Sequence, residues 1–380
     1  MVAVSYSEFS PSELFQRWDQ QEKEAREKDD GLGFYEPVQK LSNARDVFLD
    51  NRFDLNDSLP GLIKIYRRWV GEKTYLCNQY LDHETNETKY KFQLAPKRGN
   101  EKYVSDVKSR IYEKVPSTEQ LEKQHLLADE NGSNVLHITL TVDPKRYLGD
   151  LQSAWANLPY YLNKFLSAFR KRYGRCWVLR SFEAQENGFP HVHLFIISEQ
   201  TFSCEWYKGK KYWRWLIPEL TDDHKAIGAD ETVDGFENLW SLGFVYARGV
   251  GKRPYMRKQI DVKNYVVKDV VSEVSVVDVD SDVEVKNPEL TLALNWLFRR
   301  QAFSISGSDV LESVFNLIPV CLTQTEVLKN AFLRRLFEFS RYEFISFCGI
   351  VRCSEPPPDG FIKLSNDQEH ELEAQAIGVR

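Results

Sequence analysis

The sequence predicts an α+β protein, in which strands of an antiparallel hairpin follow a long amphipathic helix. Residues 137–142, HITLTV, alternate Thr with apolar side chains as a half-buried strand does. Residues 157–174 repeat apolar residues at helical spacing, admit Pro159 in the first turn and end at a glycine. Residues 176–184 and 191–198 are typical of two further strands, and Asn187-Gly188 between them is a strong hairpin signal.

Length and composition indicate a folded protein of two or three domains, since 42% of the 380 residues are hydrophobic. No apolar run approaches the ~20 residues of a membrane span, and the N-terminus lacks the features of a secretory signal. We therefore expect a cytoplasmic protein with no membrane partner. The six cysteines form no CxxC pair, so neither a disulfide framework nor a zinc finger is indicated.

The net charge of −6 hides a segregation along the chain, because residues 145–268 carry +7 and the remainder −13. The bases of this middle region are clustered and interleaved with aromatic residues, a pattern that suits a groove holding phosphates and stacking bases. A solvated surface of mixed charge is the alternative. The predicted contacts to nucleic acid are Arg170, Lys171, Arg172, Lys208, Lys210, Lys211, Lys252, Arg253, Arg257 and Lys258.

The other elements are expected on weaker patterns. Capping boxes at residues 10–13 and 323–326 predict helices over 14–28 and 327–344, and a loose tail follows from residue 354. A strand is expected around 244–247 and a helix around 262–271. The predicted divisions are a partly helical N-terminal region (1–130), a catalytic domain (131–273) with an insertion at about 199–235, an acidic linker (274–289), and a C-terminal helical region (290–380).

A pair of histidines marks the most informative segment, FPHVHLFI at residues 189–196. Successive side chains of a strand alternate between faces, so His191 and His193 share one face and can bind one metal ion. Glu183 on the partner strand would complete an open three-ligand site that suits Mg²⁺ or Mn²⁺. Glu186 at the hairpin tip is the less favoured third ligand, because a strand position is held more rigidly. Without a metal, the histidines would be a half-exposed pair.

Tyr265 and Lys268 stand three residues apart in NYVVKDV, which places them on one face of a helix. A tyrosine hydroxyl has a pKa near ~10 and needs a metal-polarised phosphate or a nearby cation to act as a nucleophile. Lysine can supply that charge. A buried tyrosine beside a snorkelling lysine gives the same pattern without any catalytic role.

The order of HITLTV, GFPHVHLFI with its preceding glutamate, WSLGFV and NYVVKDV resembles the three ordered motifs of the HUH endonucleases, specifically the rolling-circle replication initiators (Rep proteins) of plasmids and viruses. The resemblance spans residues 134–272. Conjugative relaxases of this superfamily carry their tyrosine ahead of the histidines, whereas Tyr265 follows them.

The resemblance implies an RRM-like core, a central antiparallel sheet flanked by helices, to which mainly helical N- and C-terminal additions would be attached. It implies His191, His193 and Glu183 as metal ligands. Tyr265 would nick one strand of single-stranded or hairpin origin DNA and stay joined to the 5′ phosphate, with Lys268 orienting or neutralising the site. A host polymerase would then extend the free 3′ hydroxyl, and a host replication helicase would be the other expected partner.

Departures from the family pattern leave alternatives open. Some relatives have a second tyrosine just after the lysine, where this chain has Asp269, and Tyr255 is a distant substitute. No Walker-type GxxxxGK[ST] is present, so an attached helicase domain is not expected. The alternatives are an HUH-type transposase or relaxase, an origin-binding protein that does not cleave, and a metal-dependent hydrolase whose histidines activate water.

Overall fold

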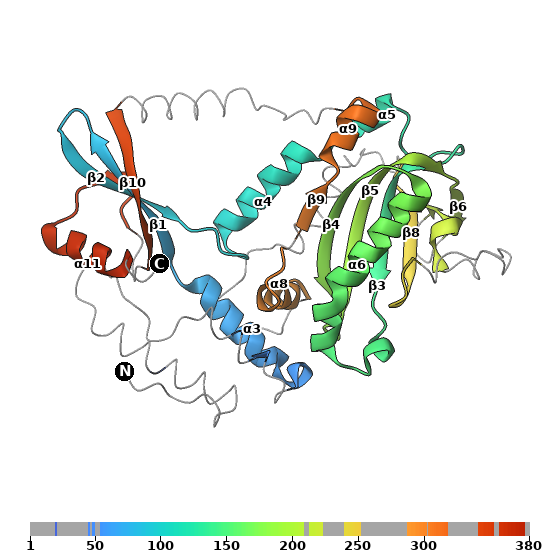
Figure 1. Cartoon of the computed structure of the whole chain (residues 1–380), viewed down its shortest axis with the longest axis horizontal. Helices are drawn as coiled ribbons and strands as arrows, with labels where there is room; N and C mark the ends of the chain where they lie inside the picture. Colours follow the sequence, from blue (N-terminus) through green and yellow to red (C-terminus); the bar gives the residue numbers. More distant parts are fainter. Residues whose placement is uncertain are drawn as a thin grey trace.

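The computed structural model describes two antiparallel sheets and several helices (Figure 1). This confirms the predicted α+β class. The described residues are Gln20, Arg45, Phe48, Leu49, 54–208, 213–222, 239–251, 287–301, 303–317, 341–352 and 357–376.

The larger sheet has seven strands in the order β6-β7-β8-β3-β5-β4-β9, and all pairings are antiparallel. The predicted hairpin is confirmed as β4 and β5, with Gly188 at its tip in the left-handed region (φ 82°). The strands are β3 Ser133–Thr141, β4 Cys176–Ala184, β5 Pro190–Phe202, β6 Glu205–Lys208, β7 Trp213–Leu216, β8 Val245–Gly249 and β9 Phe303–Ser306.

One face of this sheet is largely apolar, although Arg180 of β4 also lies on it and bonds Ser304 of β9. It packs against α6 (Leu151–Tyr173) and α8 (Asn287–Leu297), and α3 (Leu55–Gly71) joins the same core by packing on these two helices. This face uses the even-numbered residues of the central strands, such as Val192 and Leu194 of β5, which are fully buried. This cluster is the main core of the protein.

The opposite face of the sheet has an apolar part and a polar part, and we call it the divided face. The apolar part includes Phe195 and Ile197 of β5 and packs against α4 (Glu101–Lys114), α5 (Thr118–Lys123) and α9 (Ser308–Phe315). Farther along the same strands the odd-numbered residues become polar. The polar part of this face contains both histidines of the HxH pair, because residues two apart on a strand project from the same face.

The smaller sheet has the strand order β10-β1-β2-β11, and in Figure 1 it lies apart from the seven-stranded sheet. The long strands β1 and β10 pair from Thr74↔Arg352 to Asp82↔Tyr342, although they are far apart in the sequence. Helix α11 covers one face through Leu372. The elements are β1 Thr74–Asp82, β2 Glu87–Leu94, β10 Tyr342–Arg352, β11 Phe361–Ile362 and α11 Asn366–Ala376. Two 3-10 turns lie within the described residues, η3 Pro144–Tyr147 and η4 Pro218–Leu220.

Helix α6 corrects one prediction, because it begins at Leu151 rather than near Pro159. The Asp150 side chain caps it by accepting from the backbone N–H of Ser153. Pro159 lies inside the helix and removes the N–H that would bond the carbonyl of Trp155. That carbonyl instead accepts a hydrogen bond from the Arg300 guanidinium, so the proline is tolerated.

Two predictions in the C-terminal region were wrong. The helix expected over 327–344 cannot extend to Phe344, because Tyr342–Arg352 is strand β10, stabilised by pairing with β1. The tail expected to be loose contains β11, which pairs with β2 as the edge strand of the small sheet, and α11, which packs on that sheet through Leu372. Apart from Gln20, the predicted helices over 14–28 and 262–271 lie outside the described residues, as does most of the acidic linker. The predicted domain divisions stay predictions. None of the helices among the described residues has the length and apolarity to cross a membrane.

Candidate metal centre

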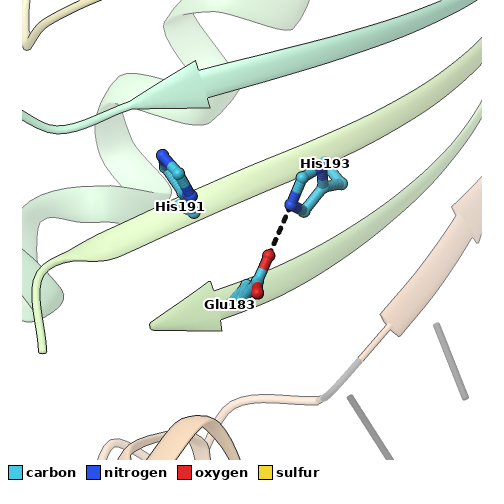
Figure 2. Close-up of side chains that lie close together, drawn as sticks. All are labelled: Glu183, His191 and His193. Atoms are coloured by element: carbon cyan, nitrogen blue, oxygen red, sulfur yellow. Dashed lines mark hydrogen bonds and ion pairs between the residues drawn. The ribbon is translucent and has the colours of Figure 1, made fainter. Parts of the chain in front are cut away.

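Three adjacent strands, β3, β5 and β4, bring the candidate site together on the polar part of the divided face. In the β4–β5 ladder Glu183 stands opposite His191, and Ser181 stands opposite His193. The side chains of Glu183, His191 and His193 therefore project from the same face (Figure 2). The sequence prediction of a shared face is confirmed.

The three side chains offer ligand atoms that all lie within 4.8 Å of one another. His193 Nε2 and Glu183 Oε2 are 2.6 Å apart, the contact drawn in Figure 2. The two side chains are 22% and 25% exposed, so an ion and its remaining ligands can approach from solvent. Two imidazoles and one carboxylate form a donor set that fits a divalent cation with open coordination positions.

Threonines on the neighbouring strand β3 support both histidines. Thr141 Oγ1 lies 2.9 Å from His191 Nε2, and Thr139 Oγ1 lies 3.3 Å from His193 Nδ1. Each threonine is the direct cross-strand partner of its histidine. Such outer contacts fix the orientation and the tautomer of a ligating ring. The alternation in HITLTV predicted the strand, but it gave no reason to assign its threonines to the histidines.

A second layer lies beyond the threonines. His137 on β3 stacks on His193, with ring centroids 5.5 Å apart and planes 4° apart. Arg248 on β8 donates from Nε to His137 Nδ1 at 3.0 Å. Burial, the Arg248 guanidinium and His193 hold the pKa of His137 well below its usual range, so the ring is neutral at pH 7. A neutral ring can stack on His193 without repelling a bound cation.

His191 is also favoured in its neutral form. Burial and the neighbouring His193 lower its pKa, and Glu183 opposes them only in part. Because a metal ion binds the neutral imidazole, a lowered pKa means less competition from protons at pH 7.

The alternative ligand Glu186 lies near the triad of Glu183, His191 and His193 but does not belong to it. Glu183, Glu186 and His191 all line an open pocket at the end of the hairpin. The cluster of converging ligand atoms contains Glu183 and not Glu186. The strand position thus brings its carboxylate to the histidines, as the sequence argument expected, whereas Glu186 lines the pocket without joining the cluster.

Helix α8 holds the end of β4 that carries Glu183. Strand β9 pairs with β4 only as far as Ser181. Beyond that point the backbone N–H of Ala184 donates to Thr291 Oγ1 at 2.8 Å, and Asn295 Nδ2 donates to the carbonyl of Phe182 at 3.1 Å. Both helix side chains are buried. These two side chains bond the β4 backbone at the end where β9 no longer pairs with it. They satisfy backbone groups that would otherwise be buried without a partner.

The predicted basic residues are not all near the triad. Arg170, Lys171 and Arg172 lie in the last turn of α6, on the other side of the sheet, and Lys208 lies on β6. Arg170 donates to Ser306 at 3.2 Å, and Arg172 lies 3.9 Å from Glu219. The predicted nucleophile Tyr265 and its neighbour Lys268 lie outside the described residues, as do Lys210, Lys211, Lys252, Arg253, Arg257 and Lys258.

Comparison with known proteins gives one viral similarity. The chain is 31% identical over 105 residues to "Uncharacterized protein 1" of Halorubrum pleomorphic virus 1. The matched stretch is 26% of this chain and spans about a fifth of the viral protein (21%). No protein-family model matches the chain. No solved structure matches it significantly.

Proposed function

We propose that this protein is a rolling-circle replication initiator of the HUH type, which nicks and rejoins single-stranded origin DNA with the help of a metal ion. The observation that carries the proposal is the convergence of His191 and His193 of β5 with Glu183 of β4. In the resemblance described above, an HxH pair on a strand of an antiparallel sheet and a nearby polar residue hold the ion. The RRM-like core is part of this proposal.

His191, His193 and Glu183 would hold Mg²⁺ or Mn²⁺, which would draw charge from the scissile phosphate and leave its bridging bond easier to break. The threonines of β3 would keep both rings aimed at the ion. Tyr265 would attack the phosphorus, its proton leaving to solvent or a base, while the 3′ oxygen departs as a hydroxyl. The phosphotyrosine conserves the bond energy, so the strand can be rejoined without ATP. Lys268 would stabilise the phosphate charge.

The connection of the chain is compatible with Tyr265 reaching the triad. The described chain resumes at Asn287, where α8 begins, and one turn later Thr291 bonds the residue next to Glu183. The chain after Tyr265 therefore enters the described structure about one helical turn before Thr291. The 22 residues from Tyr265 to Asn287 can span at most about 75 Å when fully extended, so the tether does not prevent the contact.

The test is a nicking assay on labelled single-stranded DNA with candidate origin sequence and Mn²⁺ or Mg²⁺, analysed on a denaturing protein gel. We expect a labelled covalent adduct with the wild-type chain and with Tyr255→Phe. We expect none with Tyr265→Phe or with chelator.

Each rival has its own outcome in this assay. Cleavage by Tyr265→Phe without an adduct would favour a hydrolase in which the histidines activate water. Binding of origin DNA without cleavage under any condition would favour an origin-binding protein. Activity that requires transposon-end hairpins or a transfer origin would favour a transposase or relaxase.

The similarity to a viral protein supports an extrachromosomal setting, in which the initiator would act in the cytoplasm of the host of a virus or plasmid. The host helicase and polymerase would be its partners. Addition of such host enzymes to the nicked template should extend the free 3′ hydroxyl, whereas a template treated with Tyr265→Phe should not be extended.

A further inference from the structure

An exposed phenylalanine continues the row of residues that forms the metal centre. Glu183 of β4, His191 of β5 and Thr141 of β3 are direct cross-strand partners and make up this row. The backbone N–H of Thr141 donates to the carbonyl of Phe244 at 2.8 Å, so Phe244, one residue before β8, extends the row to the next strand. Two strand spacings, about 10 Å, separate Phe244 from His191.

The Phe244 side chain points away from the main core. Its neighbour Val245 is buried in that core together with Leu140. Because successive side chains of a strand alternate between faces, Phe244 projects from the face that carries the candidate ligands. It is 65% exposed, whereas Trp240 and Leu242 just before it are buried. A lone exposed apolar residue is common on protein surfaces, and what distinguishes this one is its place in the row of the metal centre.

Contacts with β3 fix the backbone that carries Phe244. Trp240 Nε1 donates to the carbonyl of Thr141 at 2.9 Å. Gly243 passes so close to the same strand that a Cβ at this position would lie 2.2 Å from the carbonyl oxygen of Thr141. The segment is therefore in place before any ligand binds, which lowers the cost of ordering a residue that contacts the ligand.

A cation lies on the same face, beside the next row. Tyr246 of β8 pairs with Thr139, the residue that supports His193, and so shares the face with both. The Arg214 guanidinium of β7 lies 4.8 Å from the centroid of the Tyr246 ring and 5.7 Å from that of Tyr207 on β6. The buried Nε of Arg214 has no hydrogen-bond partner.

The charge of Arg214 has no counter-ion in the part of the chain that the structure describes. None of the carboxylates described there makes an ion pair with it. A guanidinium in this state favours an anion, and it is suited to phosphate because its planar fork of N–H donors matches the phosphate oxygens.

Ring, cation and metal centre together fit one ligand chemistry. A divalent ion binds a phosphate oxygen, Phe244 offers a surface for a flat group, and Arg214 offers a charge for a second anion. A nucleic-acid strand alternates flat bases and phosphates at every step. An apolar protein segment provides no charge for Arg214 or for the ion.

We infer that a DNA strand held at the metal centre lies along this side of the divided face, with the base next to the metal-bound phosphate stacked on Phe244 and a neighbouring phosphate bound by Arg214. Both contacts rest on the proposed function, because the ligand of the ion is taken to be a DNA phosphate. Phe244 and Arg214 bind the substrate and take no part in the chemistry. Neither was among the nucleic-acid contacts predicted from the sequence.

The test measures binding with Mn²⁺ by fluorescence anisotropy, in a full chain that carries Tyr265→Phe so that the ligand is not cut. The ligands are labelled oligo-dA of about 12 nucleotides and an abasic strand of the same length and charge. The variants are Phe244→Ala, Phe244→Leu, Phe244→Trp and Arg214→Gln. Tyr160→Ala and Lys164→Gln are the controls, because both residues are exposed on α6, on the other side of the sheet. Thermal unfolding checks that every variant is folded.

Each substitution has its own expected signature. Phe244→Ala should bind oligo-dA about tenfold more weakly, since stacking on one ring contributes on that order. It should bind the abasic strand like the parent chain, because that strand has no base to stack. Phe244→Leu should behave like Phe244→Ala, and Phe244→Trp like the parent.

Arg214→Gln should make binding less dependent on salt. Loss of one phosphate contact on a single strand reduces the slope of log K against log salt concentration by about 0.7. Phe244→Ala should leave this slope unchanged, because it removes no charge. Both α6 controls should match the parent chain in affinity and in slope.

Three results would overturn the inference. The first is unchanged oligo-dA affinity of folded Phe244→Ala. The second is an equal loss of affinity for oligo-dA and for the abasic strand, because the ring would then not contact a base. The third is an unchanged salt slope for Arg214→Gln.

The adduct assay, run on chains that keep Tyr265, separates this inference from the proposed function. If the adduct forms but Phe244→Ala and Arg214→Gln bind DNA like the parent chain, the proposed function stands and the inference fails. If no adduct forms under any condition while both variants show their signatures, the nicking mechanism fails and the inference stands for a strand that is bound without being cut.

Discussion

Thr291 on α8 accepts a hydrogen bond from the backbone N–H of Ala184, at 2.8 Å, directly beside the candidate ligand Glu183. A helix side chain thereby continues the ladder of β4 where β9 stops. The position of the carboxylate depends on this contact, although Thr291 itself does not contact the site's ligands.

Thr291→Val keeps the shape of the side chain and removes the acceptor. We expect a loss of about 1–3 kcal/mol in the free energy of unfolding, because the buried N–H of Ala184 loses its partner. Mn²⁺ affinity should also fall, since the end of β4 is less well held. Thr291→Ser keeps the hydroxyl and should retain most of both quantities. Denaturant titration measures the free energy of unfolding, and calorimetric titration measures the Mn²⁺ affinity. Equal values for the Val and Ser variants would contradict the role of the Thr291 hydroxyl.

Substitutions at the candidate metal ligands should give a ranked series of Mn²⁺ affinities. Glu183→Gln and His193→Ala should each lower Mn²⁺ affinity by tenfold or more, since each removes a ligand. Glu186→Gln should have little effect, because Glu186 lines the pocket but lies outside the converging cluster. His125→Asn, which removes a histidine away from the site at a left-handed position that Asn tolerates, is the control. Equal losses for Glu183→Gln and Glu186→Gln would show that the ligand assignment is wrong.

The two β3 threonines should differ in importance. Thr141→Val removes the 2.9 Å contact to His191, and Thr139→Val removes the longer 3.3 Å contact to His193. Loss of an outer contact of a ligating histidine typically costs about 10–100-fold in metal affinity. We expect Thr141→Val to be the more damaging change. Calorimetry at pH 7 gives the order, and the reverse order would mean that His193 depends more on its threonine.

Asp82 makes the small sheet sensitive to acid. Its hydrogen bonds and ion pair with Arg341 hold the pKa of the carboxyl below the usual value near 3.8. Because the folded-state pKa is the lower one, the stabilisation is full above about pH 4 to 5 and is lost as the pH falls through the folded-state pKa. Asp82→Asn should increase amide exchange of β1 and β10 at pH 7, and the difference from the wild type should shrink near pH 3. A difference that does not change with pH would contradict this linkage.

The hairpin and its histidines could be predicted because their signals are local. The alternation around His191 and His193 and the turn at Asn187-Gly188 lie within some twenty residues, and the pleat dictates which side chains share a face. The greater rigidity of a strand position favoured Glu183 over Glu186, and the structure brings the Glu183 carboxylate together with both histidines. The start of α6 was missed because Pro159 was taken for the first turn, whereas an arginine from another segment bonds the carbonyl that the proline leaves without its partner.

The rest depends on contacts between distant segments. Nothing in the local pattern near Ala184 indicates that Thr291 and Asn295 will complete its ladder, since the partners are more than 100 residues away. Residues 341–344 continue a helical pattern, and pairing with β1 makes Tyr342 onward a strand. Tertiary pairing here outweighs local preference, as is common for strands.

The two sheets also become complete at different times during synthesis of the chain. All seven strands of the larger sheet have been made once Ser306 is added, whereas β1 has no long partner on its β10 side until residues 342–352 follow. Domains generally fold as they emerge, and pairings between distant segments form slowly. A ribosome stalled shortly after β9 would thus hold a chain that has the strands of the metal centre but lacks strand β10 of the small sheet. The β1–β2 hairpin would wait, with its β10-side edge unpaired, for the last part of the message to be translated.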